Sequence, residues 1–170
     1  MNRKAKNIAE QVLIVSNIFI VFLLLFESKL VVPGWLQSVG RMHPLMLHFP
    51  IVILLLALGM EFFRFKPAYF SNEFYRNFLN NLLLIGALLA ALTVIMGLFL
   101  SKETGYSGEV LQWHKWSGVG IVFVVSLIYW LRNASWYQAP IAKAVAVFSG
   151  LSLIIAGHYG SVLTHGENFI

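Results

Sequence analysis

The stretch NLLLIGALLAALTVIMGLFL, residues 81–100, decides the fold because it runs for twenty residues without a charge. A helix that crosses the roughly 30 Å hydrocarbon layer of a bilayer needs about 20 such residues. The rest of the chain agrees, since 59% of its 170 residues are hydrophobic and only 11% are charged. Soluble domains carry about 25% charged residues. The composition therefore excludes an ordinary water-soluble fold, a disordered chain and a nucleic-acid-binding module.

Four further segments are long and apolar enough to span a membrane, at 8–26, 44–63, 114–131 and 140–159. We predict an all-α, polytopic membrane protein that forms one integral membrane domain over 1–170. The second to fifth of its five transmembrane helices form a four-helix bundle, and the first packs outside it. Small residues such as Gly86, Ala90 and Gly97 indicate close helix packing, or room for a flat ring.

The basic residues predict the orientation. With the N-terminus in the cytoplasm, eight of the 12 Lys and Arg lie on the cytoplasmic side, and the outer four are Lys29, Arg41, Lys102 and Lys115. Cytoplasmic loops carry the excess of Lys and Arg. We therefore expect a bacterial inner membrane protein with a cytoplasmic N-terminus and a periplasmic C-terminus, embedded among membrane lipids.

The chain has no Cys and five His. Disulfides, thiolate metal sites and covalent c-type haem are therefore excluded. In the predicted orientation every histidine falls near the outer face: His43, His48, His114, His158 and His165. Ionisable groups inside a bilayer are costly unless they are paired, and neutral imidazole binds iron, copper and zinc. We interpret all five as candidate metal ligands; for each single ring the alternative is a headgroup contact or a hydrogen bond to a backbone carbonyl.

A haem held by two histidines needs imidazoles from separate helices. We expect His48 to pair with His114 or His158, while His43 and His165 support the site or hold a second haem. Three basic residues on the same side can neutralise haem carboxylates, namely Arg41, Lys102 and Lys115.

Two local sequences surround these histidines. In His43 to Pro50, Pro44 suits the first turn of a helix. Pro50 has no N–H to donate to the carbonyl of Met46 and predicts that the helix is kinked or starts late. In 157–166, the glycines predict that the chain leaves the helix and turns over the outer face.

The first sequence reads His-Pro-x-x-x-His-Phe-Pro and the second Gly-His-x-Gly-x-x-Leu-Thr-His-Gly. With these motifs and His114, residues from about 40 to 170 resemble a bacterial family of predicted membrane domains that often precede a c-type cytochrome domain. The family is thought to be similar to the four-helix membrane haem b cytochromes, which implies bis-histidine ligation of haem b. This sequence has no Cys-x-x-Cys-His, so we expect any c-type partner to be another chain or to lie in a region that this sequence does not include. It also lacks the common two-haem pattern, in which histidine pairs lie toward both faces.

We therefore expect an electron-transfer subunit of a larger complex rather than a stand-alone enzyme. It would carry one or two haem b groups and pass electrons from quinol to a c-type cytochrome or another periplasmic redox protein, both by analogy. The alternative is a non-redox membrane module, with a histidine copper or zinc site or as a membrane anchor. A proton path is disfavoured because Glu27 is the only acidic residue that we expect within a span.

Overall fold

The computed structural model describes residues 2–166, and all regular secondary structure in that range is helical. This confirms the all-α prediction for the described residues. The elements, in chain order, are α1 (Arg3–Leu25), the 3₁₀ turn η1 (Glu27–Lys29), α2 (Gly34–Gly40), α3 (His43–Met46), α4 (His48–Phe63), α5 (Pro67–Phe70), α6 (Glu73–Leu100), α7 (Glu109–Leu131) and α8 (Ala139–His165).

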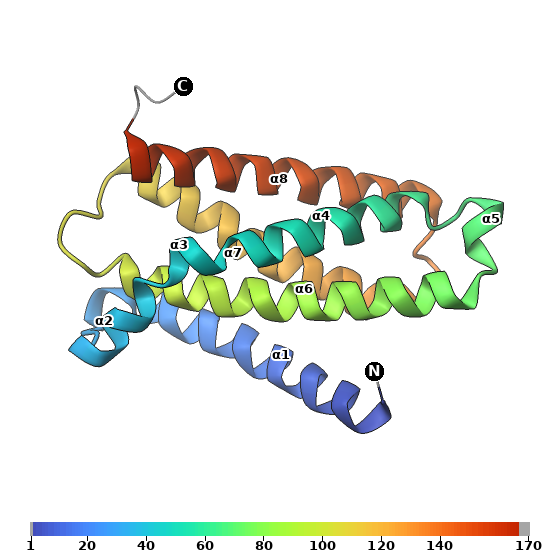
Figure 1. Ribbon diagram of the computed structural model, residues 1–170, viewed down its shortest axis with the longest axis horizontal. Helices are drawn as coiled ribbons and strands as arrows, with labels where there is room; N and C mark the ends of the chain where they lie inside the picture. Colours follow the sequence, from blue (N-terminus) through green and yellow to red (C-terminus); the bar gives the residue numbers. More distant parts are fainter. Residues whose placement is uncertain (1, 167–170) are drawn as a thin grey trace.

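Helices α4, α6, α7 and α8 form a four-helix bundle (Figure 1). Helix α7 packs against α6 and α8, and α4 packs against the same two helices, so the bundle closes on itself. Among the described helices, α1, α6, α7 and α8 are each long and apolar enough to cross a membrane. A fifth span results if Gly34–Met46 and α4 are counted together.

The second predicted span is interrupted, as the prolines indicate. Pro44 lies in the first turn of α3 and Pro50 in the first turn of α4. The segment Gly34–Met46 meets α4 at 45°. Because of this bend α3 packs on α6, which brings the His43 ring against that helix.

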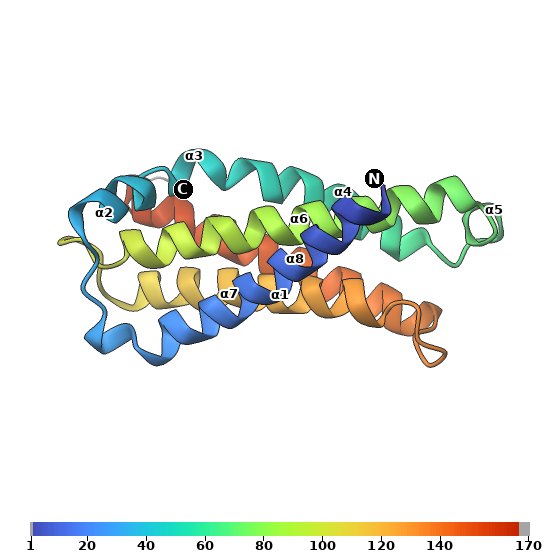
Figure 2. The same ribbon diagram turned by 90° about the horizontal axis from the view of Figure 1, so that it is seen from below.

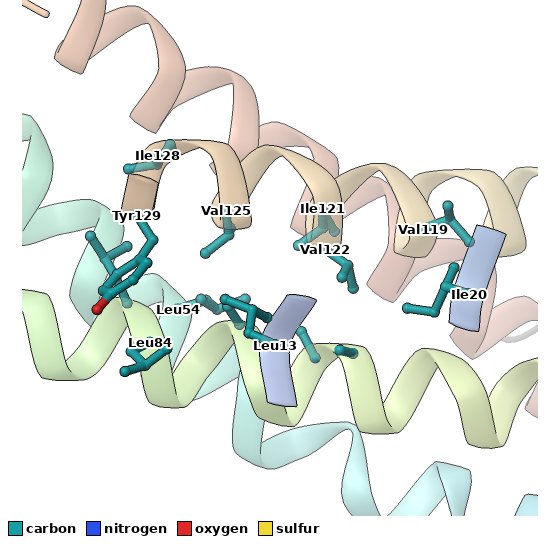
Figure 3. Packing of buried hydrophobic residues seen from close by; sticks show 14 of the residues in the cluster. Leu13, Ile20, Leu54, Leu84, Val119, Ile121, Val122, Val125, Ile128 and Tyr129 are labelled. Atoms are coloured by element: carbon teal, nitrogen blue, oxygen red, sulfur yellow. The ribbon is translucent and has the colours of Figure 1, made fainter. Parts of the chain in front are cut away.

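Small residues of α6 let its neighbours approach closely. Ala87 and Ala91 are fully buried, and a Cβ atom added to Gly86 would collide with the Leu54 side chain of α4. Figure 3 shows part of the resulting core, in which Val122 and Val125 of α7 point inward beside residues of α1 and α4. In lipid such close packing replaces the hydrophobic effect as the force that holds helices together.

Helix α1 lies outside the bundle and crosses α6 and α7 (Figure 2). Polar pairs fasten it to α7: the Tyr129 hydroxyl donates to Glu10 Oε1 at 2.6 Å, and Asn17 Nδ2 donates to Ser126 Oγ at 3.1 Å. Hydrogen bonds between membrane helices contribute about 0.6 kcal/mol each on average. Helix α1 therefore packs against α6 and α7 as part of the same fold.

Helix α8 continues further than the sequence suggests. It runs without a break through Gly157 and Gly160 to His165, and ends at Gly166, whose φ of 82° suits glycine. The prediction that the chain turns away near residue 157 is wrong. An isolated glycine inside a helix costs only about 1 kcal/mol relative to alanine, and packing of α8 on α7 outweighs that cost.

All five histidines lie toward one end of the bundle, where α4 and α7 begin and α8 ends. We call this the histidine end. The opposite end, where α4 and α7 finish, contains Arg64 and Arg132, and we call it the arginine end.

Candidate cofactor site between His43 and His114

His43 is held against α6 by one hydrogen bond and one glycine. Its Nδ1 atom lies 2.8 Å from the carbonyl oxygen of Thr93. One turn further along α6, a Cβ atom on Gly97 would come within 2.9 Å of the His43 ring. The ring therefore fits only because residue 97 has no side chain.

His114 is held against α8 in the same way. Its Nδ1 atom lies 2.9 Å from the carbonyl oxygen of Ala156, and a Cβ atom on Gly160 would come within 3.0 Å of the ring. In both cases the accepting carbonyl belongs to the residue four positions before the glycine. We call each such pair of a carbonyl and a glycine a cradle. The cradle of His43 is Thr93 and Gly97 on α6, and that of His114 is Ala156 and Gly160 on α8.

These hydrogen bonds fix the tautomer of each neutral ring. A carbonyl oxygen only accepts, so both Nδ1 atoms carry hydrogen and donate, and both Nε2 atoms keep their lone pairs. The ring centroids are 5.8 Å apart and the ring planes are inclined by 80°. Two imidazoles on one metal ion, with metal–nitrogen distances of about 2.0–2.1 Å, have centroids roughly 6 Å apart. The pair therefore has the spacing of two ligands on one ion.

Both rings line a cavity of about 430 Å³ at the histidine end. Its deep part is apolar, with Leu54, Ile121 and Leu153 among the lining residues, whereas Lys115, Ser161 and Thr164 line it toward the histidine end. Ligand pockets are typically about 300–1,000 Å³ and mostly apolar with a few polar groups. The lining thus suits an amphiphile whose polar part lies toward the histidine end.

The structure distributes the other histidines differently from the prediction. His48 and His165 are exposed and line the same cavity. His158 is exposed, lies outside that lining, and its ring meets Tyr159 edge to face at 5.3 Å. The ring beside His114 is therefore that of His43, and not that of His48 or His158 as we expected. The bend between α3 and α4 explains the difference, because it brings His43 onto α6 while His48 stays at the surface.

The predicted basic residues are all engaged in ion pairs. Arg41 Nε lies 3.0 Å from Glu103 Oε1, outside the cavity lining. Lys115 Nζ lies 2.9 Å from both oxygens of Glu27, and Lys102 Nζ lies 3.4 Å from one of them. Of the three, only Lys115 lines the cavity.

Glu27 joins η1 to α6 and α7, and its titration offers a test of that link. Burial raises the pKa of this carboxyl, but Lys115 and Lys102 outweigh burial and hold the pKa below its usual value. A lowered native pKa stabilises the fold above the unfolded-state pKa of about 4.3, and this contribution is lost as the pH falls through the native pKa. We expect Glu27→Gln to lower the melting temperature at pH 7, and the difference from wild type to shrink below about pH 4. A melting-temperature series against pH measures this, with the exposed Glu109→Gln as control; a constant difference at all pH values contradicts it.

One comparison with known proteins returns a match. The family described as predicted membrane protein (DUF2231) matches residues 41–169. The chain belongs to this family. The match contains all five histidines, Gly97 and Gly160, while helix α1 precedes it. No curated protein and no solved structure matches the chain.

The sequence did not lead us to predict a cluster of charged residues, which lies within the matched range 41–169. Glu61 is completely buried at the arginine end, with Oε1 3.4 Å from Arg64 Nη1 and Oε2 3.4 Å from Arg132 Nε. Arg64 Nη1 also donates to the carbonyl of Arg132 at 2.7 Å, and Arg132 Nη1 donates to Asn80 Oδ1 at 2.7 Å. The cluster joins α4, α6 and α7. The expectation that Glu27 alone lies within a span is wrong, because Glu27 lies in η1 after the end of α1. Glu10 and Glu61 stand inside the predicted spans 8–26 and 44–63, and that was the available signal.

The donor set limits which metal centres the site can form. Among residues 2–166, no three His, Cys, Asp or Glu side chains gather as ligands for one ion. Structural zinc sites use four protein ligands and catalytic ones use three. Two imidazoles at this spacing could serve only a metal that arrives with most of its ligands already in place, such as haem iron.

Proposed function

We propose that this protein is a membrane-bound electron-transfer subunit that holds haem b between His43 and His114. The observation that carries the proposal is the pair of matching cradles, which leave two Nε2 lone pairs on rings 5.8 Å apart in a largely apolar cavity. When bound, haem supplies reversible one-electron chemistry. A single haem accounts for this pair, so one group per chain is the form we propose.

The chain's own residues bind and orient the group. The carbonyls of Thr93 and Ala156 keep both rings in the ligating tautomer, and such partners raise the basicity of a ligand. Leu54, Ile121 and Leu153 keep water from the deep side of the cavity. Lys115, held by Glu27, is the cation available to a carboxylate at the outer edge.

The positive-inside count supports a bacterial inner membrane location with the histidine end toward the periplasm. That location favours a lipid-soluble quinol as electron donor and a c-type cytochrome, or another periplasmic redox protein, as acceptor. The chain would then act as part of a complex rather than alone.

An absorbance spectrum of the purified protein tests the proposal. We expect a dithionite-reduced α band of b-type haem, with about one haem per chain by pyridine haemochrome assay. Metal analysis of the same sample separates the alternatives. A colourless protein with stoichiometric copper or zinc favours a non-redox metal module, and one with neither favours a membrane anchor; both results reject haem.

A further inference from the structure

The cavity at the histidine end opens sideways, toward the lipid. Its exposed lining residues include Pro44 and His48 on one side, and Gly157, Thr164 and His165 of α8 on the other. The α6 and α7 residues of the lining are buried or half-buried. In Figure 1, α4 lies close to α8 near the arginine end and diverges from it toward α3. The mouth of the cavity therefore includes the gap between α3–α4 and α8, and the exposed Tyr106 of the loop before α7 lines it at the end of the bundle.

This mouth extends along α8 below the histidine end of the bundle. Gly157 precedes the last residue of α8 by eight positions, which is about 12 Å at 1.5 Å per residue. His48 lies beyond the α3–α4 break, in the first turn of α4. In the predicted orientation, a molecule from the outer part of the bilayer would approach the cavity through this gap between helices.

His48 is an exposed imidazole at this mouth with a weak partner. Its Nδ1 atom lies 3.5 Å from the carbonyl of Leu45, beyond the usual 2.7–3.2 Å of a protein hydrogen bond. The ring therefore has hydrogen-bonding capacity left for a ligand of the cavity that it lines. A hydroxyl or carbonyl group on a largely apolar molecule would supply that partner.

We infer that His48 is the proton acceptor for a quinol that enters the mouth between α4 and α8; this inference rests on the proposed function. Oxidation of one quinol to quinone breaks two O–H bonds and releases two protons and two electrons. The protons pass in turn to a ring nitrogen of His48 and from there to water at the histidine end. The electrons would pass one at a time to ferric haem b, and the c-type cytochrome named in the proposed function would take up each electron, so that the haem is reoxidised before the second one arrives.

Two matched exposed histidines test this role. His48→Gln keeps a hydrogen-bonding side chain but cannot take up a proton, and His158→Gln alters an exposed histidine outside the cavity lining. With a decyl-substituted benzoquinol and the purified haem-loaded protein, we expect His48→Gln to lower the limiting rate of haem reduction about 100-fold or more, the usual contribution of a general base. Its KM should change by less than about threefold, because the hydrogen bond is kept. His158→Gln should match the wild type.

Binding of the quinone form gives a second readout that needs no electron transfer. We expect His48→Leu to weaken binding of the decyl-benzoquinone, followed by tryptophan fluorescence, about tenfold, as the loss of one hydrogen bond predicts. Equal rates in His48→Gln and wild type, or equal losses in His48→Gln and His158→Gln, overturn the inference while leaving haem in place. A wild type without haem rejects the proposed function instead. In that case the fluorescence measurement still tests the quinone site without haem. Equal binding of the decyl-benzoquinone by His48→Leu and the wild type rejects that site.

Discussion

Replacing Glu61 with glutamine is expected to reduce the free energy of unfolding by about 3–5 kcal/mol, as breaking one side of a buried ion pair typically does. Glu61 is fully buried, and it is the carboxylate within ion-pair distance of both Arg64 and Arg132. Its loss leaves two nearly buried guanidinium groups without an anion. Among the described residues, the Nε atoms of both arginines already have no hydrogen-bond partner, so the cluster has little capacity to compensate.

Thermal unfolding of the detergent-solubilised protein measures this effect. Glu73→Gln is the matched control, because Glu73 is exposed in the first turn of α6, where the helix dipole contributes at most about 1 kcal/mol. Glu61→Gln should lower the melting temperature much more than Glu73→Gln does. Similar small losses in both would mean that the buried cluster contributes little to stability.

Alanine at Gly160 should displace the His114 ring, and alanine at Gly97 should displace the His43 ring. Each added Cβ would approach a ring atom to within about 3 Å, and overpacking of this kind costs about 1–3 kcal/mol. If the rings ligate haem, the shift should weaken haem binding about 10–100-fold, as changes in the residues behind a ligand usually do. Titration of the haem-free protein with haem measures the affinity.

The matched control for Gly160 is Gly157, three residues earlier in α8. A Cβ atom at Gly157 meets nothing within 4 Å, so Gly157→Ala should raise stability by up to about 1 kcal/mol through helix propensity alone. Gly160→Ala should lower stability instead. The opposite signs test the cradle without any cofactor, and stabilisation by both substitutions would contradict it.

The sequence predicted the membrane-spanning helices and the common end of the histidines because both depend on position along the chain. Uncharged runs of about 20 residues locate spans, and antiparallel neighbours bring His43, His114 and His165 to one end. Pro44 and Pro50 predicted the interrupted helix for the same local reason.

The pairing of the histidines could not be predicted in this way. Which ring faces His114 depends on the direction in which α3 leaves the break, and that direction is set by packing on α6. The carbonyls of Thr93 and Ala156 carry no signal in the sequence, since every residue has one. Gly97 stood out only as a small packing residue, and Gly160 was assigned to a turn.

The haem content of four single histidine variants tests the central claim most directly. If His43 and His114 are the axial ligands, His43→Ala and His114→Ala should each lose the reduced b-type band, whereas His48→Ala and His158→Ala should retain it at about the wild-type haem-to-protein ratio. Retention of the full band in His43→Ala, together with its loss in His48→Ala or His158→Ala, would contradict the account.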